Sequence, residues 1–180
     1  MRVRTPARRI IPLLLLSLVC LSADGRSWLG GLFSPKGTGL SSLSTAGEST
    51  YSLLRADLLL DMNGIIRGWN TSPGLRLRFA NNYVLASAEF STGTVFHFLA
   101  GPGLTVGYVS DIDNVFGWMG GVTADTALMF DFTRHIALCL SLSADFGMHY
   151  RSVDHHAVLS SYRSGMYHAY YPELTIYYRF

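Results

Sequence analysis

The chain has 180 residues, a formal net charge of +2 and two cysteines, Cys20 and Cys139. Four arginines within the first nine residues account for the basic balance, and residues 26–180 hold ten basic and eleven acidic side chains. This near-neutral remainder gives no argument for nucleic-acid binding. Only Cys139 lies beyond residue 25, which excludes a disulfide within that part, and its length suits one domain.

The first 25 residues have the order of a secretory signal peptide. A positive start is followed by an apolar run over 10–21 and by small residues over 22–25. The run is shorter than the roughly 20 residues that a membrane-spanning helix needs, which disfavours a transmembrane anchor. We predict cleavage after Gly25, with Ser22 as the alternative, and export to an oxidising compartment. The bulky Val19 before Cys20 disfavours a lipoprotein signal.

Residues 26–49 are rich in Gly, Ser and Thr, include Pro35 and show no sustained period. This composition is typical of flexible segments. We therefore predict a flexible periplasmic segment, or a loose plug of the barrel, ahead of a folded domain at 50–180.

From Tyr51 onward, apolar and polar residues alternate with period two, which is the pattern of strands with one apolar and one polar face. Turns are predicted at Asn81–Asn82, at 100–103 and at 133–135. The alternation then predicts eight strands, at 51–61, 74–80, 83–91, 94–101, 103–110, 118–132, 135–150 and 166–180.

The two faces of these strands differ in a way that favours a membrane. The polar face mixes small residues with charges of both signs, which suits the narrow, filled interior of an eight-stranded barrel. The apolar face carries almost no charge, as lipid requires, because a charge at the bilayer midplane costs roughly 2–4 kcal/mol. The fold class predicted is all-β, an antiparallel up-and-down transmembrane β-barrel, with a soluble lipocalin-type barrel as the alternative. Inside it we expect Arg55, Arg76, Arg78 and Arg179 to pair with Asp57, Glu89, Asp125, Asp145 and Glu173.

Aromatic residues of the apolar face cluster near the predicted strand ends, as expected of two interfacial rings. The periplasmic ring is predicted to hold Phe79, Phe130, Phe132, Tyr178 and Phe180. The outer ring is predicted to hold Phe90, Phe96, Tyr108, Trp118, Tyr150 and Tyr170.

The last strand alternates through Leu174, Ile176 and Tyr178 to a final aromatic residue, Phe180. With the stretches 99–109 and 129–138, it resembles small bacterial outer-membrane β-barrel proteins, OmpA- and OmpX-like in size, and most of all those of Bacteroidetes. The resemblance covers 51–180. It implies the outer membrane of a Gram-negative cell, contact with its lipids and lipopolysaccharide, and recognition of Phe180 by the assembly machinery.

The loop over 151–165 is the richest in chemistry. Neighbouring imidazoles and a carboxylate at Asp154, His155 and His156 suit Zn²⁺ or Cu²⁺, but a polar surface loop is the simpler interpretation, since adjacent histidines on a strand point apart. We therefore assign no metal ligand and no cofactor site.

An alternative is a barrel that hydrolyses or transfers lipid A acyl chains. His149 and Asp145 share an interior face, with Ser152, Ser160 and Ser161 in the next loop, yet four residues of strand separate the pair by about 13 Å. The His-x-Ser pair of lipid A deacylases is absent. We predict that these residues are structural and that the chain is not an enzyme.

Three further features have structural interpretations. His97 is an interior residue that needs only a local partner, and Cys139 fills space among serines. The glycines over 117–121 lie in or near a strand with no lysine and no helix after them, so they relieve crowding and do not form a phosphate loop.

Together these features favour an integral outer-membrane barrel with a structural or surface-interaction role and no open pore. An extracellular ligand would meet the loops near 62–72, 111–117 and 152–165. A small-solute channel is the remaining alternative, and paired charges in a narrow lumen argue against it.

Overall fold

The computed structural model describes residues 27–45, 51–62, 74–110, 116–153, 156–160 and 167–179. The described secondary structure consists of nine β-strands, and none of these residues belongs to a helix that could cross a membrane. The strands are β1 (Ser27–Ser34), β2 (Gly37–Thr45), β3 (Ser52–Asp61), β4 (Gly74–Glu89), β5 (Val95–Ser110), β6 (Phe116–Asp131), β7 (Ile136–Val153), β8 (His156–Ser160) and β9 (Tyr167–Arg179).

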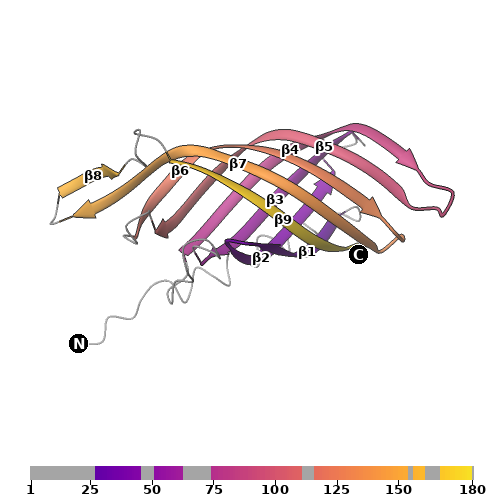
Figure 1. Cartoon of the computed structure of the whole chain (residues 1–180), viewed down its shortest axis with the longest axis horizontal. Helices are drawn as coiled ribbons and strands as arrows, with labels where there is room; N and C mark the ends of the chain where they lie inside the picture. Colours follow the sequence, from indigo (N-terminus) through magenta and orange to yellow (C-terminus); the bar gives the residue numbers. More distant parts are fainter. Residues whose placement is uncertain are drawn as a thin grey trace, which may run out of the picture.

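Eight of the strands form a closed ring (Figure 1). Each strand from β1 to β7 pairs antiparallel with the next, β7 pairs with β9, and β9 returns to β1. β8 stands outside the ring, because it pairs with β7 only where that strand runs on past β9. The predicted fold class, an all-β antiparallel up-and-down barrel of eight strands, is confirmed.

The strands of the ring are staggered, and the stagger sets their tilt. A path along paired residues from Trp28 through β2 to β7 reaches β9 at Ala169, whereas Trp28 itself pairs with Arg179, ten residues away. Ten residues of stagger over eight strands tilt the strands by about 40° from the barrel axis. The ring is also uneven, since β1 and β9 share six residue pairs while β5 and β6 share sixteen.

The prediction of a flexible segment over 26–49 is wrong, because 27–34 and 37–45 form strands β1 and β2. Trp28 and Leu32 point inward and are almost fully buried, while Phe33 points outward and is half exposed. The barrel therefore begins at Ser27, well before residue 50. Glycines, serines and threonines at most other positions remove the contrast between the faces and hide the period-two signal. The predicted signal peptide lies outside the described residues.

Two predicted turns are also wrong, because 81–82 and 100–103 lie within the continuous strands β4 and β5. The outward face of β4 changes from odd to even residue numbers at a β-bulge between Val84 and Ala86, where the register with β5 shifts by one residue. A bulge and a turn both shift apolar residues from odd to even positions, and in the sequence alone Asn81–Asn82 has the composition of a turn. In β5, Pro102 occupies one of the outward positions, and the strand continues through it without a turn. The prediction divided β4 and β5 into two strands each and missed β1 and β2. These errors cancel, so the predicted number of ring strands, eight, is still correct.

The inside of the barrel is layered. An apolar layer lies at the end of the barrel where β1 begins at Ser27 and β9 ends at Arg179, which we call the end of the termini, and charged groups fill the middle. A second apolar group lies nearer the other end and consists of Leu32, Leu59, Val109, Met119 and Tyr171. The first layer consists of Trp28, Leu43, Leu99, Ala127, Met129, Ala137, Cys139 and Tyr177.

Two adjacent glycines of β6 provide a test of this packing. A Cβ on Gly121 would overlap the carbonyl oxygen of Phe146 and lie 2.6 Å from the Cα of Gly147, whereas a Cβ on Gly120 meets nothing within 4 Å. We expect Gly121→Val to destabilise the barrel by at least the roughly 1–3 kcal/mol of an overpacked core, and Gly120→Val to be nearly neutral. Urea unfolding of both variants measures the difference, and equal midpoints would contradict the close approach of β6 and β7.

Candidate functional site

A buried ionic network crosses the lumen and is centred on Arg55. This guanidinium lies 3.0 Å from Asp57, 3.1 Å from Asp125 and 2.7 Å from Glu173, and it also donates to the hydroxyl of Ser141 at 2.9 Å. Four strands supply these groups, because inward positions of β3, β6, β7 and β9 converge on the barrel axis. Arg55 therefore ties opposite walls of the ring together.

Two further arginines extend the network. Arg78 pairs with Asp57 at 2.5 Å and with Glu173 at 2.6 Å. Arg76 pairs with Asp145 at 2.6 Å and with Asp61 at 2.7 Å. Paired and hydrogen-bonded charges of this kind satisfy groups that would be costly to bury alone.

Neutral side chains complete the network around Asp125, whose carboxylate accepts hydrogen bonds from Asn82 at 2.7 Å and from Ser143 at 2.6 Å. The inward position of Asn82 was missed in the sequence, because a turn was predicted there. Two predicted members are not in the network: Glu89 is exposed, and Arg179 lies over the ring of Trp28 at 5.3 Å. Both residues are close to the ends of their strands, beyond the charged middle of the lumen.

Packed side chains enclose this network on both sides along the barrel axis. The apolar layer at the termini includes Leu43 and Tyr177, each at most 2% exposed, and the other group includes Leu32 and Tyr171, both at 0%. The Tyr177 hydroxyl hydrogen-bonds Ser41 at 2.6 Å. The side chains described in the lumen therefore link the walls of the barrel and keep the charged groups buried.

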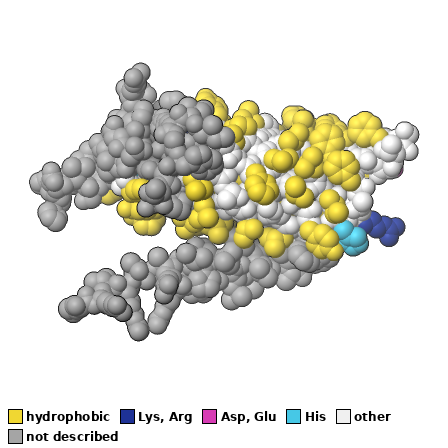
Figure 2. All heavy atoms as spheres, turned by 60° about the horizontal axis from the view of Figure 1, so that its bottom comes forward, with side chains coloured by type: hydrophobic (Ala, Val, Ile, Leu, Met, Phe, Trp, Pro, Cys, Tyr) yellow, Lys and Arg dark blue, Asp and Glu magenta, His cyan; other side chains and the backbone are white. Residues whose placement is uncertain are grey.

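The outer wall has the opposite character. At outward positions of the eight ring strands, the described residues include no Asp, Glu, Lys or Arg. Many large apolar side chains at outward positions of the ring strands are 38–62% exposed, among them Leu85, Leu104, Val122, Leu140 and Ile176. Figure 2 shows hydrophobic side chains over much of the described wall, with a His side chain and a Lys or Arg side chain coloured at one end. Such a surface suits an apolar surrounding better than water.

Aromatic side chains form two groups on this wall. At the end opposite to the termini, Tyr108 contacts Phe116 and Trp118 with ring centroids 5.7 and 5.4 Å apart. At the other end, Phe130 contacts Phe96 at 5.3 Å and Phe132 at 6.4 Å. The structure thus corrects the predicted positions of Phe90 and Phe96, which lie at the end of the termini, because β4 and β5 each run the full height without the two predicted turns.

The spacing of the two aromatic groups can be estimated along β6. Trp118 and Phe130 are twelve residues apart, which is about 40 Å along a strand. At a tilt of about 40° this becomes about 30 Å along the barrel axis, close to the hydrocarbon thickness of a bilayer.

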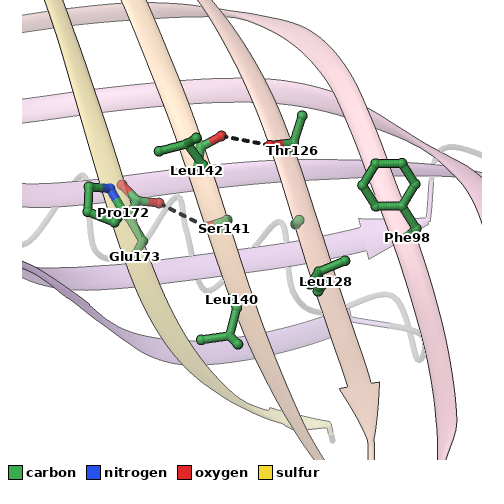
Figure 3. A pocket seen from close by; sticks show the side chains of 9 residues that line it. Phe98, Thr126, Leu128, Leu140, Ser141, Leu142, Pro172 and Glu173 are labelled. Atoms are coloured by element: carbon green, nitrogen blue, oxygen red, sulfur yellow. Dashed lines mark hydrogen bonds between the residues drawn. The ribbon is translucent and has the colours of Figure 1, made fainter.

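A shallow hollow of about 430 Å³ lies on the wall across β5, β6, β7 and β9 (Figure 3). Phe98, Leu128, Leu140, Leu142 and Pro172 line it. The hydroxyl of Thr126 is already donated to the carbonyl of Leu142 at 3.2 Å, and Ser141 donates to Glu173 at 3.2 Å. The hollow offers apolar surface and no reactive group.

The structure does not bring the weighed catalytic residues together. Asp145 pairs with Arg76, whereas the Nε2 of His149 lies 2.9 Å from the carbonyl oxygen of Val109. Cys139 is 3% exposed within the apolar layer, which agrees with a space-filling role. The side chains of Ser152, Asp154, His155, His156, Ser160 and Ser161 lie outside the described part of the chain.

His97 has the local partner that the sequence predicted, and it is Ser87, whose hydroxyl lies 2.7 Å from Nδ1. The contact with Asp131, 3.8 Å from Nε2, was missed, because the predicted turn at 100–103 put an extra strand between His97 and the strand that carries Asp131. The glycines over 117–121 lie inside β6, as predicted. Within the described residues, no three His, Cys, Asp or Glu side chains gather as metal ligands.

These features define the chain as a closed eight-stranded antiparallel β-barrel with a charged, filled lumen and an apolar wall. Its architecture is consistent with a small barrel of the outer-membrane type. Comparisons with protein-family models, curated proteins and solved structures give no match. The similarity to OmpA- and OmpX-like proteins is therefore one of architecture, and a relation to Bacteroidetes proteins has no support from these comparisons.

Proposed function

We propose that this barrel is an integral protein of the outer membrane of a Gram-negative bacterium, with a structural or surface-interaction role and no open pore. The observation that carries the proposal is the wall without charged residues between two aromatic groups about 30 Å apart. A soluble barrel would place such a surface in water, whereas hydrocarbon favours it. Closure of the ring also leaves no long unpaired edge, which lipid penalises.

The topology supports an orientation. The ring strands start and end on one side, which we assign to the periplasm. Short turns at 90–94 and 132–135 lie on that side too. The strand ends that are joined by 62–73, 111–115 and 154–166 lie on the other side, together with the hairpin turn at Pro35–Lys36. Longer connections facing the exterior are usual for such barrels, so an extracellular ligand would meet this second side.

The proposal includes its partners. Outer-membrane lipids and lipopolysaccharide would surround the wall, and the assembly machinery would read Phe180 together with the strand before it, β9. The filled lumen supports a role without solute transport, because charged side chains are paired there and apolar layers lie on both sides of them.

The first experiment compares unheated and boiled samples from an outer-membrane fraction by electrophoresis in SDS. A closed, detergent-resistant barrel is expected to migrate differently before and after boiling. Single-channel recording of the same refolded protein is expected to show no steady conductance. Recovery of the protein in the soluble periplasm without a mobility shift would overturn the membrane assignment, and a stable conductance would overturn the absence of a pore.

A further inference from the structure

Three polar side chains meet inside the barrel mouth on the side of the termini, on neighbouring strands. Ser87 of β4 and His97 of β5 are directly opposite each other, and Asp131 of β6 is diagonal to His97. The Ser87 hydroxyl lies 2.7 Å from Nδ1 of His97, and Nε2 of His97 lies 3.8 Å from the carboxylate of Asp131. From this geometry we propose that Ser87, His97 and Asp131 form a second site, which hydrolyses carboxylic esters with short acyl groups.

Ladder geometry explains why the serine and histidine are so close. The amide of Phe90 donates to the carbonyl of Thr94, so this pair is hydrogen-bonded. Pairs alternate along an antiparallel ladder, and Ser87–His97 is therefore a pair without backbone hydrogen bonds, the kind whose side chains are closest. The contact between Ser87 and His97 is therefore determined by the pairing of β4 with β5.

The same alternation supplies a donor for the reaction. The backbone N–H of Ser87 points away from β5, toward the side where β3 would pair. Among the described residues, β3 pairs with β4 only as far as Tyr83, with one more bond from the amide of Val84 to Tyr51. No described residue pairs with the Ser87 amide on that side, and the amide lies beside its own hydroxyl, where it can donate to an oxyanion.

The tautomer required by the reaction is the one that the neighbours favour. With the proton on Nε2 facing the Asp131 carboxylate, Nδ1 is free to accept the proton of Ser87. Asp131 acts as a positioning residue, and its second oxygen, Oδ1, is buried without a hydrogen-bond partner. The histidine and aspartate side chains are about a quarter exposed, so solvent and a small ester reach them.

The reaction balances with water as the only co-substrate. The Ser87 oxygen attacks the ester carbonyl while its proton passes to Nδ1 of His97. The bond from the carbonyl carbon to the alcohol oxygen then breaks, and the leaving alcohol takes that proton from His97. Water attacks the acyl-serine, gives a proton to His97 and releases the acid, and Ser87 regains its proton. Buried Leu99 and Met129 close the lumen next to His97, which restricts the site to short acyl groups.

The test uses the full-length protein refolded in detergent and a fluorophosphonate probe, with peptide mass spectrometry to locate the label. We expect labelling at Ser87, none in Ser87→Ala, a rate roughly 100-fold lower in His97→Gln, and unchanged labelling in Ser91→Ala, a matched exposed serine of the same hairpin. Asp131→Asn should slow labelling, and Asp131→Glu should restore part of the rate, which a purely structural role would not produce. Hydrolysis of p-nitrophenyl butyrate should follow the same order.

Two outcomes separate this site from the membrane proposal. If Ser87 stays unlabelled while the protein shows its heat-dependent shift, the esterase site is refuted and the barrel assignment stands. If Ser87 is labelled in a protein found in the soluble periplasm, the site stands and the membrane assignment falls. Equal labelling of Ser91 and Ser87 also refutes the site, because it means that His97 gives no activation.

Discussion

Replacing Arg55 by methionine is expected to lower the free energy of unfolding by about 3–5 kcal/mol, the cost of breaking a buried ion pair by removing one partner. The change leaves Asp57, Asp125 and Glu173 inside the lumen without the guanidinium that they share. Arg78 still reaches two of these carboxylates, whereas Asp125 keeps only neutral donors. The effect should therefore be close to that of an uncompensated buried charge.

The change in unfolding free energy is measured by urea unfolding of the barrel in lipid vesicles, with the fraction of folded protein read from its electrophoretic mobility without boiling. Arg134→Met is the matched control, because Arg134 is exposed in the turn between β6 and β7 and should change the unfolding free energy by at most about 0.5 kcal/mol. If both variants unfold at the same urea concentration, the ionic network does not stabilise the barrel.

The second large effect is expected on the outer wall. Leu142→Arg places a charge on β7 opposite Thr126 of β6, at a level well between the two aromatic groups and at a position that is 49% exposed. In a bilayer this should cost roughly 2–4 kcal/mol, falling to about 0–1 kcal/mol near the interface. Leu85→Arg, at the bulge near the end of the termini, is the matched control.

Folding free energies of the two variants in vesicles distinguish a membrane barrel from a soluble one. In water an outward arginine costs little at either position, because its head stays solvated. A difference of 2 kcal/mol or more between the variants supports the membrane assignment. Two nearly neutral variants would contradict it.

Sequence alternation predicted the two faces of the barrel well, because an apolar exterior and a charged lumen leave a strong period-two signal. Arg55, Arg78, Asp57 and Glu173 were assigned to the inside and are found paired there. The pattern is reliable wherever a strand carries large side chains on one face.

The same pattern failed where the contrast between faces is weak or interrupted. β1 and β2 place Gly, Ser and Thr on both faces, so they looked flexible. In β4 a bulge reverses the alternation without a turn, and the pairing partners that reveal it are far away in the sequence. The Ser87–His97–Asp131 contacts depend on that hairpin register, which single-sequence periodicity does not determine.

The short pairing between β1 and β9 has a consequence for how the chain is assembled. Six residue pairs join the first strand to the last, so the ring cannot close until the whole chain is present. Contacts that distant in sequence form slowly, and until they form two open strand edges are exposed to other chains. The amides that pair β1 with β9 should therefore be the last to gain protection from hydrogen exchange during folding and the first to lose it during unfolding. A catalyst of assembly that holds these two edges would act on the step that limits the rate.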